Sequence, residues 1–313
     1  MTRLDRDGPI TVFAPARVDL SPGFTDVEPF CTDLPGHIVN VALDRGIEVT
    51  VRSCAAEQLG DSFAERLCAA VAGRLGVARP ALRLAAPSLP VGGGLGMSGA
   101  LSVALACALS VLAAAPVGPA DLAALACAGE RDTGLLGGTQ DQLASAHGGA
   151  GLVQRHGSTS RRRPIEADLP ALAARLVLVH GGGVRNSGSI IEHVLHEGAR
   201  AGVLRTIRSM NRLAEDMVPV LAGGDHEWLA DLMNESTSLL TALHPAIVGD
   251  GIHSWLRSAG AAGAKPCGAG GEAAVWATLV HPAARPAFVA SVTAAGWSVL
   301  PAAPGALGAR RTG

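Results

Sequence analysis

The sequence predicts an α+β protein built from two domains. Residues 10–53 contain short β-type runs, whereas most apolar runs that follow have helical spacing, so strands and helices do not alternate regularly. A polar and basic stretch at 154–170 interrupts the apolar periodicity near the middle of the chain. At about 100 to 200 residues per domain, 313 residues accommodate two. We therefore expect an N-terminal domain at residues 1–165 and a C-terminal domain at residues 166–313.

The first half begins with three expected strands, at 10–20, 38–44 and 47–53. The third alternates with period two and is rich in Val, Ile and Thr, which is typical of a half-buried strand. Pro119 and Asp121 are suited to the first turn of a helix. The other elements expected in this half are a helix at 62–75, a strand at 81–86, and helices at 98–114, 119–133 and 138–147.

In the second half, the run ARLVLVHGG at 174–182 predicts a strand. The stretch at 154–170 is interpreted as a hairpin or an exposed connection. The remaining elements expected in this half are helices at 187–221, 225–242 and 246–260, a strand at 273–280, a helix at 283–296 and a strand at 297–302.

Composition favours a small molecule as the ligand. The formal net charge is −2, which gives no electrostatic reason to expect nucleic acid or an anionic membrane as a partner. The six cysteines show neither a CxxC pair nor zinc-finger spacing, so we expect buried, reduced thiols in a cytoplasmic protein. The longest apolar stretch, 101–117, is short for a membrane span, contains Pro116 and is interpreted as a buried helix. The first ten residues lack the apolar core of a signal peptide.

A glycine loop, Gly92-Gly93-Gly94-Leu95-Gly96, directly precedes the apolar helix expected at 98–114. Glycines let backbone N–H groups approach an anion closely, and the helix dipole favours negative charge at the same point. The loop matches neither the GxGxxG nor the GxxxxGK[ST] pattern. From its glycines alone, it is either a phosphate-binding loop or a tight turn between a strand and a helix.

Four ordered segments resemble motifs of the GHMP kinase superfamily. They are APARVDLSPGFTDVEPF (14–30), PVGGGLGMSGA (90–100), ERDTGLLGGTQDQLASAHGG (130–149) and AKPCGAGGEAAVW (264–276), and MNES (233–236) also resembles a recurrent motif. The resemblance is greatest to the sugar-kinase branch, which includes fucokinase, galactokinase and D-glycero-D-manno-heptose 7-phosphate kinase. It extends over most of the chain.

The resemblance implies two α+β domains, an N-terminal one like domain 2 of ribosomal protein S5 and a C-terminal ferredoxin-like one, with the active site in the cleft between them. It also implies an ATP-dependent and Mg²⁺-dependent kinase, a monomer or homodimer, that phosphorylates a hydroxyl of a sugar or sugar phosphate, the anomeric one in the most similar branch. Two alternatives stay open: a kinase for a cyclitol or other non-sugar alcohol, and a catalytically silent nucleotide or sugar sensor.

The resemblance assigns catalytic roles to two residues. Asp141 corresponds to the family's catalytic acid/base, and Arg17 would lie beside it and stabilise charge. Glu130, eleven residues before Asp141, corresponds to a magnesium-binding glutamate, and Ser98 would assist it. The alternatives are a helix-surface aspartate, a surface arginine, and a glutamate paired with a neighbouring arginine.

Nucleotide binding is assigned to the glycine loop and the residues after it: Gly92, Gly93, Gly94, Leu95, Gly96, Met97, Ser98 and Gly99. Met97 stands where the family usually has a serine that binds Mg²⁺, and a thioether is a poor ligand for that hard ion. Either Glu130, phosphates, water and Ser98 suffice for the metal, or efficient catalysis has been lost.

Substrate binding is assigned first to Asp26 and Asp19, because a carboxylate accepts two hydroxyl hydrogen bonds at once. Asp19 has the alternative of merely supporting the loop. The run Arg161 to Arg163 is either a solvated hairpin end or a site for a phosphorylated substrate, and Glu272 departs from the family pattern by replacing a glycine. The other expected substrate-binding residues are Gly138, Gln140, Arg185, Gly268 and Gly270.

Overall fold

The computed structural model describes residues 8–53, 60–135, 137–182, 194, 201–271 and 273–313. Its first sheet has six strands in the order β10-β1-β2-β4-β5, with β3 pairing along another part of β2. All the pairings are antiparallel. The strands are β1 (Ile10–Asp19), β2 (Gly36–Arg52), β3 (Ala81–Leu84), β4 (Ala150–His156), β5 (Thr159–Ile165) and β10 (Arg310–Arg311).

Strand β2 runs unbroken over the two strands predicted at 38–44 and 47–53. Gly46 makes this continuity possible, because a Cβ there would lie 2.0 Å from the carbonyl oxygen of Ala14 on β1. On β1 the register shifts between Pro15 and Arg17. The backbone N–H of Arg17 donates instead to the carbonyl of Leu95 in the glycine loop, at 3.0 Å.

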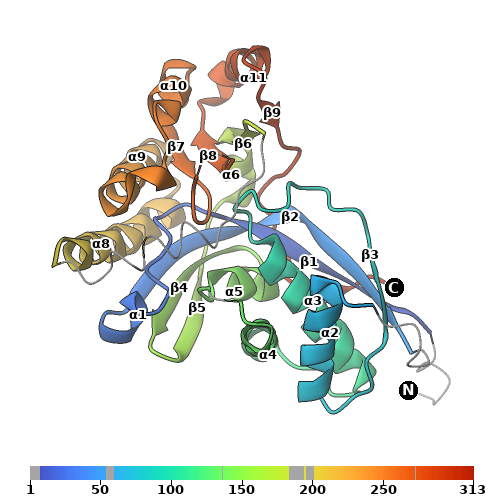
Figure 1. Cartoon of the computed structure of the whole chain (residues 1–313). Helices are drawn as coiled ribbons and strands as arrows, with labels where there is room; N and C mark the ends of the chain where they lie inside the picture. The colour runs from blue at the N-terminus through green and yellow to red at the C-terminus, as the bar shows by residue number, and fades with distance from the viewer. Residues whose placement is uncertain (1–7, 54–59, 136, 183–193, 195–200, 272) are drawn as a thin grey trace.

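Four helices pack beside the first sheet (Figure 1): α2 (Phe63–Arg74), α3 (Met97–Leu112), α4 (Pro119–Asp132) and α5 (Gln140–His147). Helix α3 contacts β1, β2, α2, α4 and α5. Small and apolar residues on every side of α3 fit this central position, since a helix without a polar face is buried all round. Its first turn is therefore held firmly at the place where the glycine loop ends.

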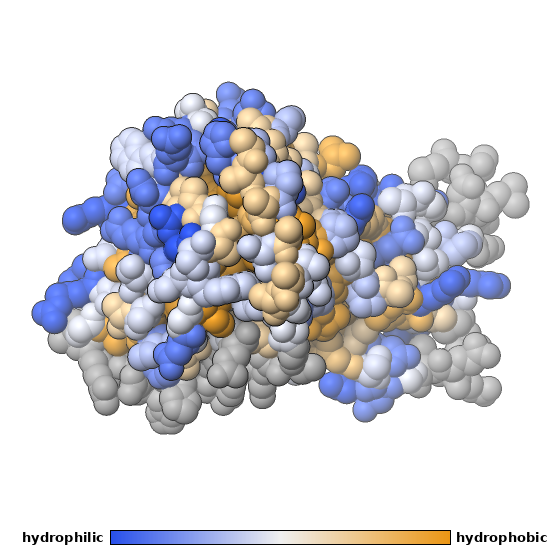
Figure 2. Space-filling view, turned by 90° about the horizontal axis from the view of Figure 1, so that it is seen from above, coloured by the Kyte–Doolittle hydropathy of each residue, from blue (hydrophilic) through white to orange (hydrophobic). Residues whose placement is uncertain are grey.

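The second sheet has four antiparallel strands in the order β7-β8-β6-β9, and helices α8 to α11 accompany it (Figure 1). Seen from above, Figure 2 shows a mixed surface, with hydrophilic residues toward the edges and moderately hydrophobic residues through the middle. The strands are β6 (Leu176–His180), β7 (Gly263–Pro266), β8 (Val275–Leu279) and β9 (Ser298–Val299), and the helices are α8 (Ala201–Gly223), α9 (His226–Leu243), α10 (Ile252–Ser258) and α11 (Arg285–Ala294).

Several predicted elements differ in the structure. The stretch at 154–170 contains a hairpin of β4 and β5, which confirms one of its two interpretations, but α6 (Leu169–Arg175) was not predicted. The strand predicted at 174–182 is the shorter β6. The helix predicted at 246–260 is replaced by the 3-10 turn η3 (Pro245–Ile247) and α10, because Gly249 and Gly251 adopt left-handed φ angles of 73° and 72°. Strand β7 was not predicted, and two short helical segments, α1 (Phe30–Asp33) and η4 (Pro282–Ala284), complete the described elements.

Asn234, in the MNES segment on α9, stabilises the edge of the second sheet. Its Oδ1 accepts hydrogen bonds from the backbone N–H of Ala264 at 3.1 Å and from His253 at 3.0 Å. Its Nδ2 donates to the carbonyl of Ala262 at 3.0 Å. The amide side chain therefore pairs with β7 much as a neighbouring strand would, and it fastens this edge strand to α9.

The C-terminal tail returns to the first sheet. Strand β10 pairs with β1, Pro304 forms a bridge with Leu43, and the N–H of Asp44 donates to the carbonyl of Ala303 at 2.8 Å. The end of β5 coincides with the predicted boundary after Ile165, but residues beyond 302 pack with the N-terminal part of the chain. The division into 1–165 and 166–313 stays a prediction. No helix among the described residues is long and apolar enough to cross a membrane.

Candidate active site

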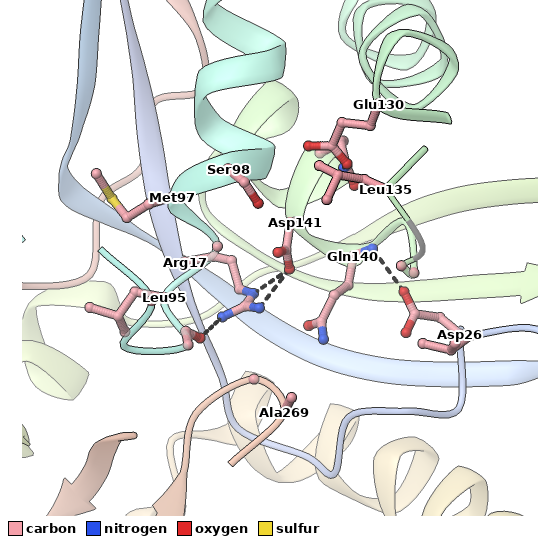
Figure 3. Close-up of a pocket in the computed structure, with 18 of the residues that line it drawn as sticks. Arg17, Asp26, Leu95, Met97, Ser98, Glu130, Leu135, Gln140, Asp141 and Ala269 are labelled. Atoms are coloured by element: carbon pink, nitrogen blue, oxygen red, sulfur yellow. Dashed lines mark hydrogen bonds and ion pairs between the residues drawn. The ribbon is translucent and has the colours of Figure 1, made fainter. Parts of the chain in front are cut away.

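A cavity of about 580 Å³ lies where the glycine loop, α5 and the loop after β7 meet (Figure 3). Both halves of the chain line it, since Gly268 and Ala269 contribute from the second half. This is the position predicted for the active site. The residues singled out from the sequence that line the cavity are Arg17, Asp26, Gly92, Gly94, Leu95, Gly96, Met97, Ser98, Glu130, Gly138, Gln140, Asp141 and Gly268.

The first turn of α3 offers free backbone donors to the cavity. Gly96 occupies the N-cap with a left-handed φ of 70°, and no side chain caps the helix. The first N–H groups of a helix have no partner within it, and the helix dipole adds positive potential there. The turn is therefore suited to holding an anion such as a phosphate.

Two glycines of this turn also make room for Asp141. A Cβ on Gly99 would lie 2.4 Å from the Cβ of Asp141, and one on Gly96 would lie 3.0 Å from its Cγ. Gly99 lies behind Asp141 and is absent from the cavity wall. Gly93 is also absent from it, because its carbonyl accepts the N–H of Val275 on β8 at 2.8 Å. Gly93 and Gly99 thus serve packing around the cavity, and nucleotide binding by them stays a prediction.

Arg17 and Asp141 form the central ion pair of the cavity (Figure 3). Arg17 donates to Asp141 Oδ1 from Nε at 2.8 Å, and its Nη2 lies 2.6 Å from the same oxygen. Its Nη1 donates to the carbonyl of Gly94. Burial by itself disfavours the guanidinium charge, but Asp141 and Asp19 raise the pKa of Arg17 above its ordinary value. Arg17 therefore stays charged and joins Asp141 to the glycine loop.

Glu130, at the end of α4, faces the same cavity. Its Oε1 accepts from the hydroxyl of Ser102 at 3.0 Å, and its Oε2 accepts from Nε2 of Gln142 at 2.5 Å. Burial, with a further contribution from the charge of Asp141, raises the pKa of Glu130 to about 7. No arginine pairs with Glu130 within the described residues, so this alternative from the sequence is wrong.

The donor set fits a magnesium ion carried with phosphate. Glu130 and Asp141 bring two carboxylates to the cavity, and the charge of Asp141 disfavours that of Glu130. The described residues contain no group of three or more His, Cys, Asp and Glu side chains suited to a metal. Mg²⁺ commonly takes one or two protein carboxylates and completes its shell with phosphate oxygens and water. Glu130 and the exposed Ser98 would hold it, whereas Met97 is buried and points away from Asp141 in Figure 3.

Replacing Glu130 with glutamine is expected to raise the unfolding free energy strongly at pH 8 and little at pH 5. The pKa of about 7 in the folded chain lies above the ordinary 4.5, so the unfolded chain ionises first and the charged form opposes folding as the pH rises. Removing the Glu130 charge is expected to raise the unfolding free energy by roughly 3 kcal/mol at pH 8 and by under about 1 kcal/mol at pH 5. Urea denaturation at both pH values measures it. The exposed Glu227→Gln is the control, and a pH-independent effect of Glu130→Gln would contradict the prediction.

Asp26 caps the helix that carries Asp141. Its Oδ2 accepts the N–H groups of Thr139 at 2.6 Å and Gln140 at 2.9 Å. Burial raises the pKa of Asp26, although these two donors oppose the change. A Cβ on Gly138 would lie 2.0 Å from Asp26 Oδ2, which explains the glycine there. Asp26 thus lines the cavity with one oxygen already engaged, and its contact with substrate stays a prediction.

Asp19 lies outside the cavity wall and ties the two halves of the chain together. Its Oδ2 accepts from Lys265 Nζ at 2.7 Å, and its Oδ1 accepts from the N–H of Gly268 at 2.9 Å. Both charged side chains are fully buried. This geometry favours the supporting role that the sequence left open for Asp19. Lys265, the only lysine of the chain, received no role from the sequence, although it lies in one of the four motif segments.

The remaining predicted residues divide into three groups. Gly138, Gln140 and Gly268 line the cavity. Gly270 does not, because it packs against η3, where a Cβ would lie 2.1 Å from the carbonyl oxygen of Ile247. Arg185 and Glu272 fall outside the described residues.

Two arginines near the site have roles that the sequence did not predict, Arg155 and Arg162. Arg155 on β4 is buried and donates to the carbonyl of Asp26 at 2.9 Å and to Glu28 Oε1 at 2.5 Å, so it holds the Asp26 loop. Arg162 is partly buried, in contrast to the exposed Arg161 and Arg163. The interpretation of this run as a solvated hairpin end is therefore wrong for its middle residue, because strand alternation turns Arg162 to the opposite face.

Comparisons of the sequence with known proteins found two matches. A family model described as the GHMP kinases N terminal domain matches residues 62–149. A mevalonate kinase from Aeropyrum pernix is 31% identical over 186 residues, which cover 58% of this chain and 56% of that protein. The chain thus matches little more than half the length of this curated relative.

Solved structures are similar over almost the whole chain. A D-glycero-D-manno-heptose 1-phosphate kinase from Bacteroides thetaiotaomicron has a TM-score of 0.74 at 20% identity, covering 97% of this chain and 99% of that one. The Lin0012 protein from Listeria innocua has a TM-score of 0.81 at 13% identity, with the same coverage of 97% and 99%. Residues 62–149 therefore match the GHMP kinases N terminal domain, and the chain has the same α+β fold as these solved structures.

Proposed function

We propose that this protein is an ATP-dependent kinase that phosphorylates a hydroxyl, by resemblance the anomeric one, of a sugar or sugar phosphate. The observation that carries the proposal is the Arg17 and Asp141 ion pair, set against the uncapped first turn of α3. Phosphoryl transfer needs positioned phosphates, neutralised charge and an acceptor for the proton of the attacking hydroxyl. The described residues provide all three within one cavity.

In the proposed mechanism, Asp141 accepts the proton of the substrate hydroxyl. Its Oδ1 is held by Arg17, and Oδ2 has no hydrogen-bond partner among the described residues, so Oδ2 is the oxygen available to the hydroxyl. The backbone N–H groups at the start of α3 hold phosphate oxygens, and Arg17 stabilises negative charge that develops nearby. Glu130 and Ser98 would hold Mg²⁺, which would supply positive charge to neutralise the phosphates.

The surroundings of Gln140 favour a substrate with several hydroxyl groups. The residue is only 7% exposed, and its side chain lies between Asp141 and Asp26 in Figure 3. Its Oε1 has no hydrogen-bond partner among the described residues. An unpaired buried amide oxygen is costly, so a substrate hydroxyl that donates to it gains affinity. A sugar can present such a hydroxyl next to the one that reacts with Asp141.

A second candidate is a kinase for a non-sugar alcohol, which the identity to the mevalonate kinase of Aeropyrum pernix favours. Incubation with ATP, Mg²⁺ and a panel of hexoses, heptose phosphates, cyclitols and mevalonate distinguishes the two. ADP release and ³¹P NMR of the product identify the substrate and the hydroxyl. We expect turnover of a sugar or sugar phosphate. Turnover of mevalonate or a cyclitol alone would establish the second candidate, and tight binding without turnover of any compound would establish a silent sensor.

Substituting Gln140 with leucine is expected to raise KM for the sugar about 3-fold to 10-fold, because one neutral hydrogen bond to substrate is lost. KM for ATP is expected to stay within about 2-fold, since Gln140 lies on the side of Asp141 away from the glycine loop in Figure 3. Initial rates with each substrate varied in turn measure both constants. Gln154→Leu, on β4 and outside the cavity wall, is the control. An unchanged KM for the sugar would remove Gln140 from the substrate site.

A further inference from the structure

We infer that Arg162 is a positioning residue, which holds the helix bearing Asp141 from its C-terminal end. The inference rests on the proposed function in that it concerns the same site. Helix α5 packs against β4 and β5 (Figure 1). Arg162, on β5, donates hydrogen bonds to the two residues that follow the helix. Its Nη1 donates to the carbonyl of Gly148 and its Nη2 to that of Gly149, each at 2.7 Å.

The partners of Arg162 are all neutral oxygens. No carboxylate pairs with it in the part of the chain that the structure describes. Burial lowers its pKa to about 10, so this placement is costly unless something compensates for it. The compensation is the end of α5, where the helix dipole favours a cation. The carbonyl of Gly148 accepts from Arg162, and the carbonyl of Gly149 accepts from Arg162 and from the N–H of Ala42 at 2.9 Å. Asp26 supplies the complementary negative charge at the start of the same helix.

A second connection leads from Arg162 to the residue before Asp141. The Nε of Arg162 donates to Asn40 Oδ1 at 3.2 Å. The Nδ2 of this asparagine, which is fully buried on β2, donates to the carbonyl of Gln140 at 3.3 Å. Arg162 therefore bonds directly to the end of α5 and, through Asn40, to its beginning.

The neighbouring strand leaves space for this arginine. A Cβ on Gly151 of β4 would lie 2.5 Å from the Cζ of Arg162. The guanidinium thus lies flat over a glycine, and any larger residue would displace it. Arg161 and Arg163 on the same strand are exposed and make no contact with α5 carbonyls.

The position of α5 matters because Asp141 meets Arg17 through two short contacts to one oxygen, at 2.8 Å and 2.6 Å. A shift of about 1 Å in a reacting group can lower a rate about 100-fold. Loss of the Arg162 contacts would let α5 shift along its axis, away from the geometry that Asp26 and Arg17 define. The expected consequence is a slower chemical step with nucleotide binding intact.

The test compares Arg162→Met with the matched controls Arg161→Met and Arg163→Met. For Arg162→Met we expect kcat to fall about 10-fold to 100-fold, with KM for ATP within about 2-fold of wild type. Hydrogen exchange of the amides at 140–147 is expected to accelerate, while that of α3 stays unchanged. Arg162→Lys, which keeps the charge and loses the fork, is expected to recover part of kcat. The two controls are expected to match wild type in every measurement.

Gly151→Ala provides a second route if Arg162→Met does not fold, because it displaces the guanidinium without removing it. We expect the same loss of kcat and the same faster exchange in α5. Wild-type kcat and wild-type exchange of 140–147 in the Arg162 or Gly151 variant would overturn the inference. If the wild-type protein phosphorylates nothing in the panel, the proposed function fails, whereas hydrogen exchange, which needs no substrate, still decides whether Arg162 holds α5.

Discussion

Asp141→Asn is expected to reduce kcat about 1000-fold, within the range that a general base contributes. Asparagine has nearly the same shape, but its amide cannot accept the proton of the attacking hydroxyl. The substitution also removes the negative charge that pairs with Arg17 at 2.6 Å, so the guanidinium is left buried with Asp19 as its nearest carboxylate, at 3.6 Å. The loss should therefore appear mainly in kcat, measured by coupled ADP release with the substrate that the panel identifies.

The control for this substitution is Asp231→Asn, at an exposed position of α9 far from the cavity wall. Calorimetry with a non-hydrolysable ATP analogue should show nearly wild-type binding by Asp141→Asn, because the glycine loop and Glu130 remain. A kcat within about 10-fold of wild type would show that another group accepts the proton, and Asp141 would then lose its assigned role.

Lys265→Met is expected to lower the unfolding free energy at pH 7 by about 3 to 5 kcal/mol, as the removal of one partner from a buried ion pair does. The side chains of Lys265 and Asp19 are both fully buried, with 0% exposure, and Lys265 Nζ lies 2.7 Å from Asp19 Oδ2. After the substitution, Asp19 keeps only the N–H of Gly268 at 2.9 Å and Arg17 at 3.6 Å. Urea denaturation measures the change.

The stability loss in Lys265→Met is expected to depend on pH in a definite direction. Burial alone would raise the pKa of Asp19, but Lys265 first and Arg17 second hold it below its ordinary value. In the wild type, the stability from Asp19 is present above the unfolded pKa and is lost as the pH falls through the folded one. In Lys265→Met the pKa of Asp19 is expected to rise, so the loss of stability relative to wild type should shrink between pH 7 and pH 5.

Two further variants show whether the loss comes from the buried charge. The double substitution Asp19→Asn with Lys265→Met removes both charges, and it should recover much of the stability lost in Lys265→Met. Arg45→Met removes an exposed arginine that lies 3.9 Å from Asp44, and it should change the unfolding free energy by less than about 1 kcal/mol. Equal losses in Arg45→Met and Lys265→Met, or no recovery in the double variant, would contradict the interpretation.

The fold class and much of the cavity could be predicted from local patterns. The glycine loop, the uniformly apolar helix after it and the Gly-rich start of α5 each carry their information within about 20 residues, and resemblance to known motifs joined Arg17 to Asp141 across 124 positions. Periodicity located most helices of the first half to within a few residues. It failed where glycine φ angles interrupt a helix, as at Gly249 and Gly251, and where short edge strands have no distinctive pattern, as in β7.

The roles of individual charged residues were harder to predict, because a charge acquires its role from partners that are distant in the chain. Asp19 finds Lys265 246 positions away, and Asn40 and Arg162 are separated by 122 positions. From the sequence, Asp19 and Asp26 are both candidates for binding substrate hydroxyls, and Asp19 has the alternative of supporting the loop. In the structure, Asp19 is enclosed by the second half of the chain, whereas Asp26 borders the cavity.

By itself, the sequence determined the α+β class, the glycine loop and the chemical types of the groups available for phosphoryl transfer, because backbone conformation and hydrophobic periodicity are local properties. Only the tertiary structure decided that Arg162, unlike its exposed neighbours Arg161 and Arg163, contacts the end of α5, and that Lys265 forms a buried ion pair. It also decided that Met97 is buried and points away from Asp141, whereas Ser98 is exposed. The physical reason is that desolvation and ion pairing depend on which elements pack together, and long-range packing decides that.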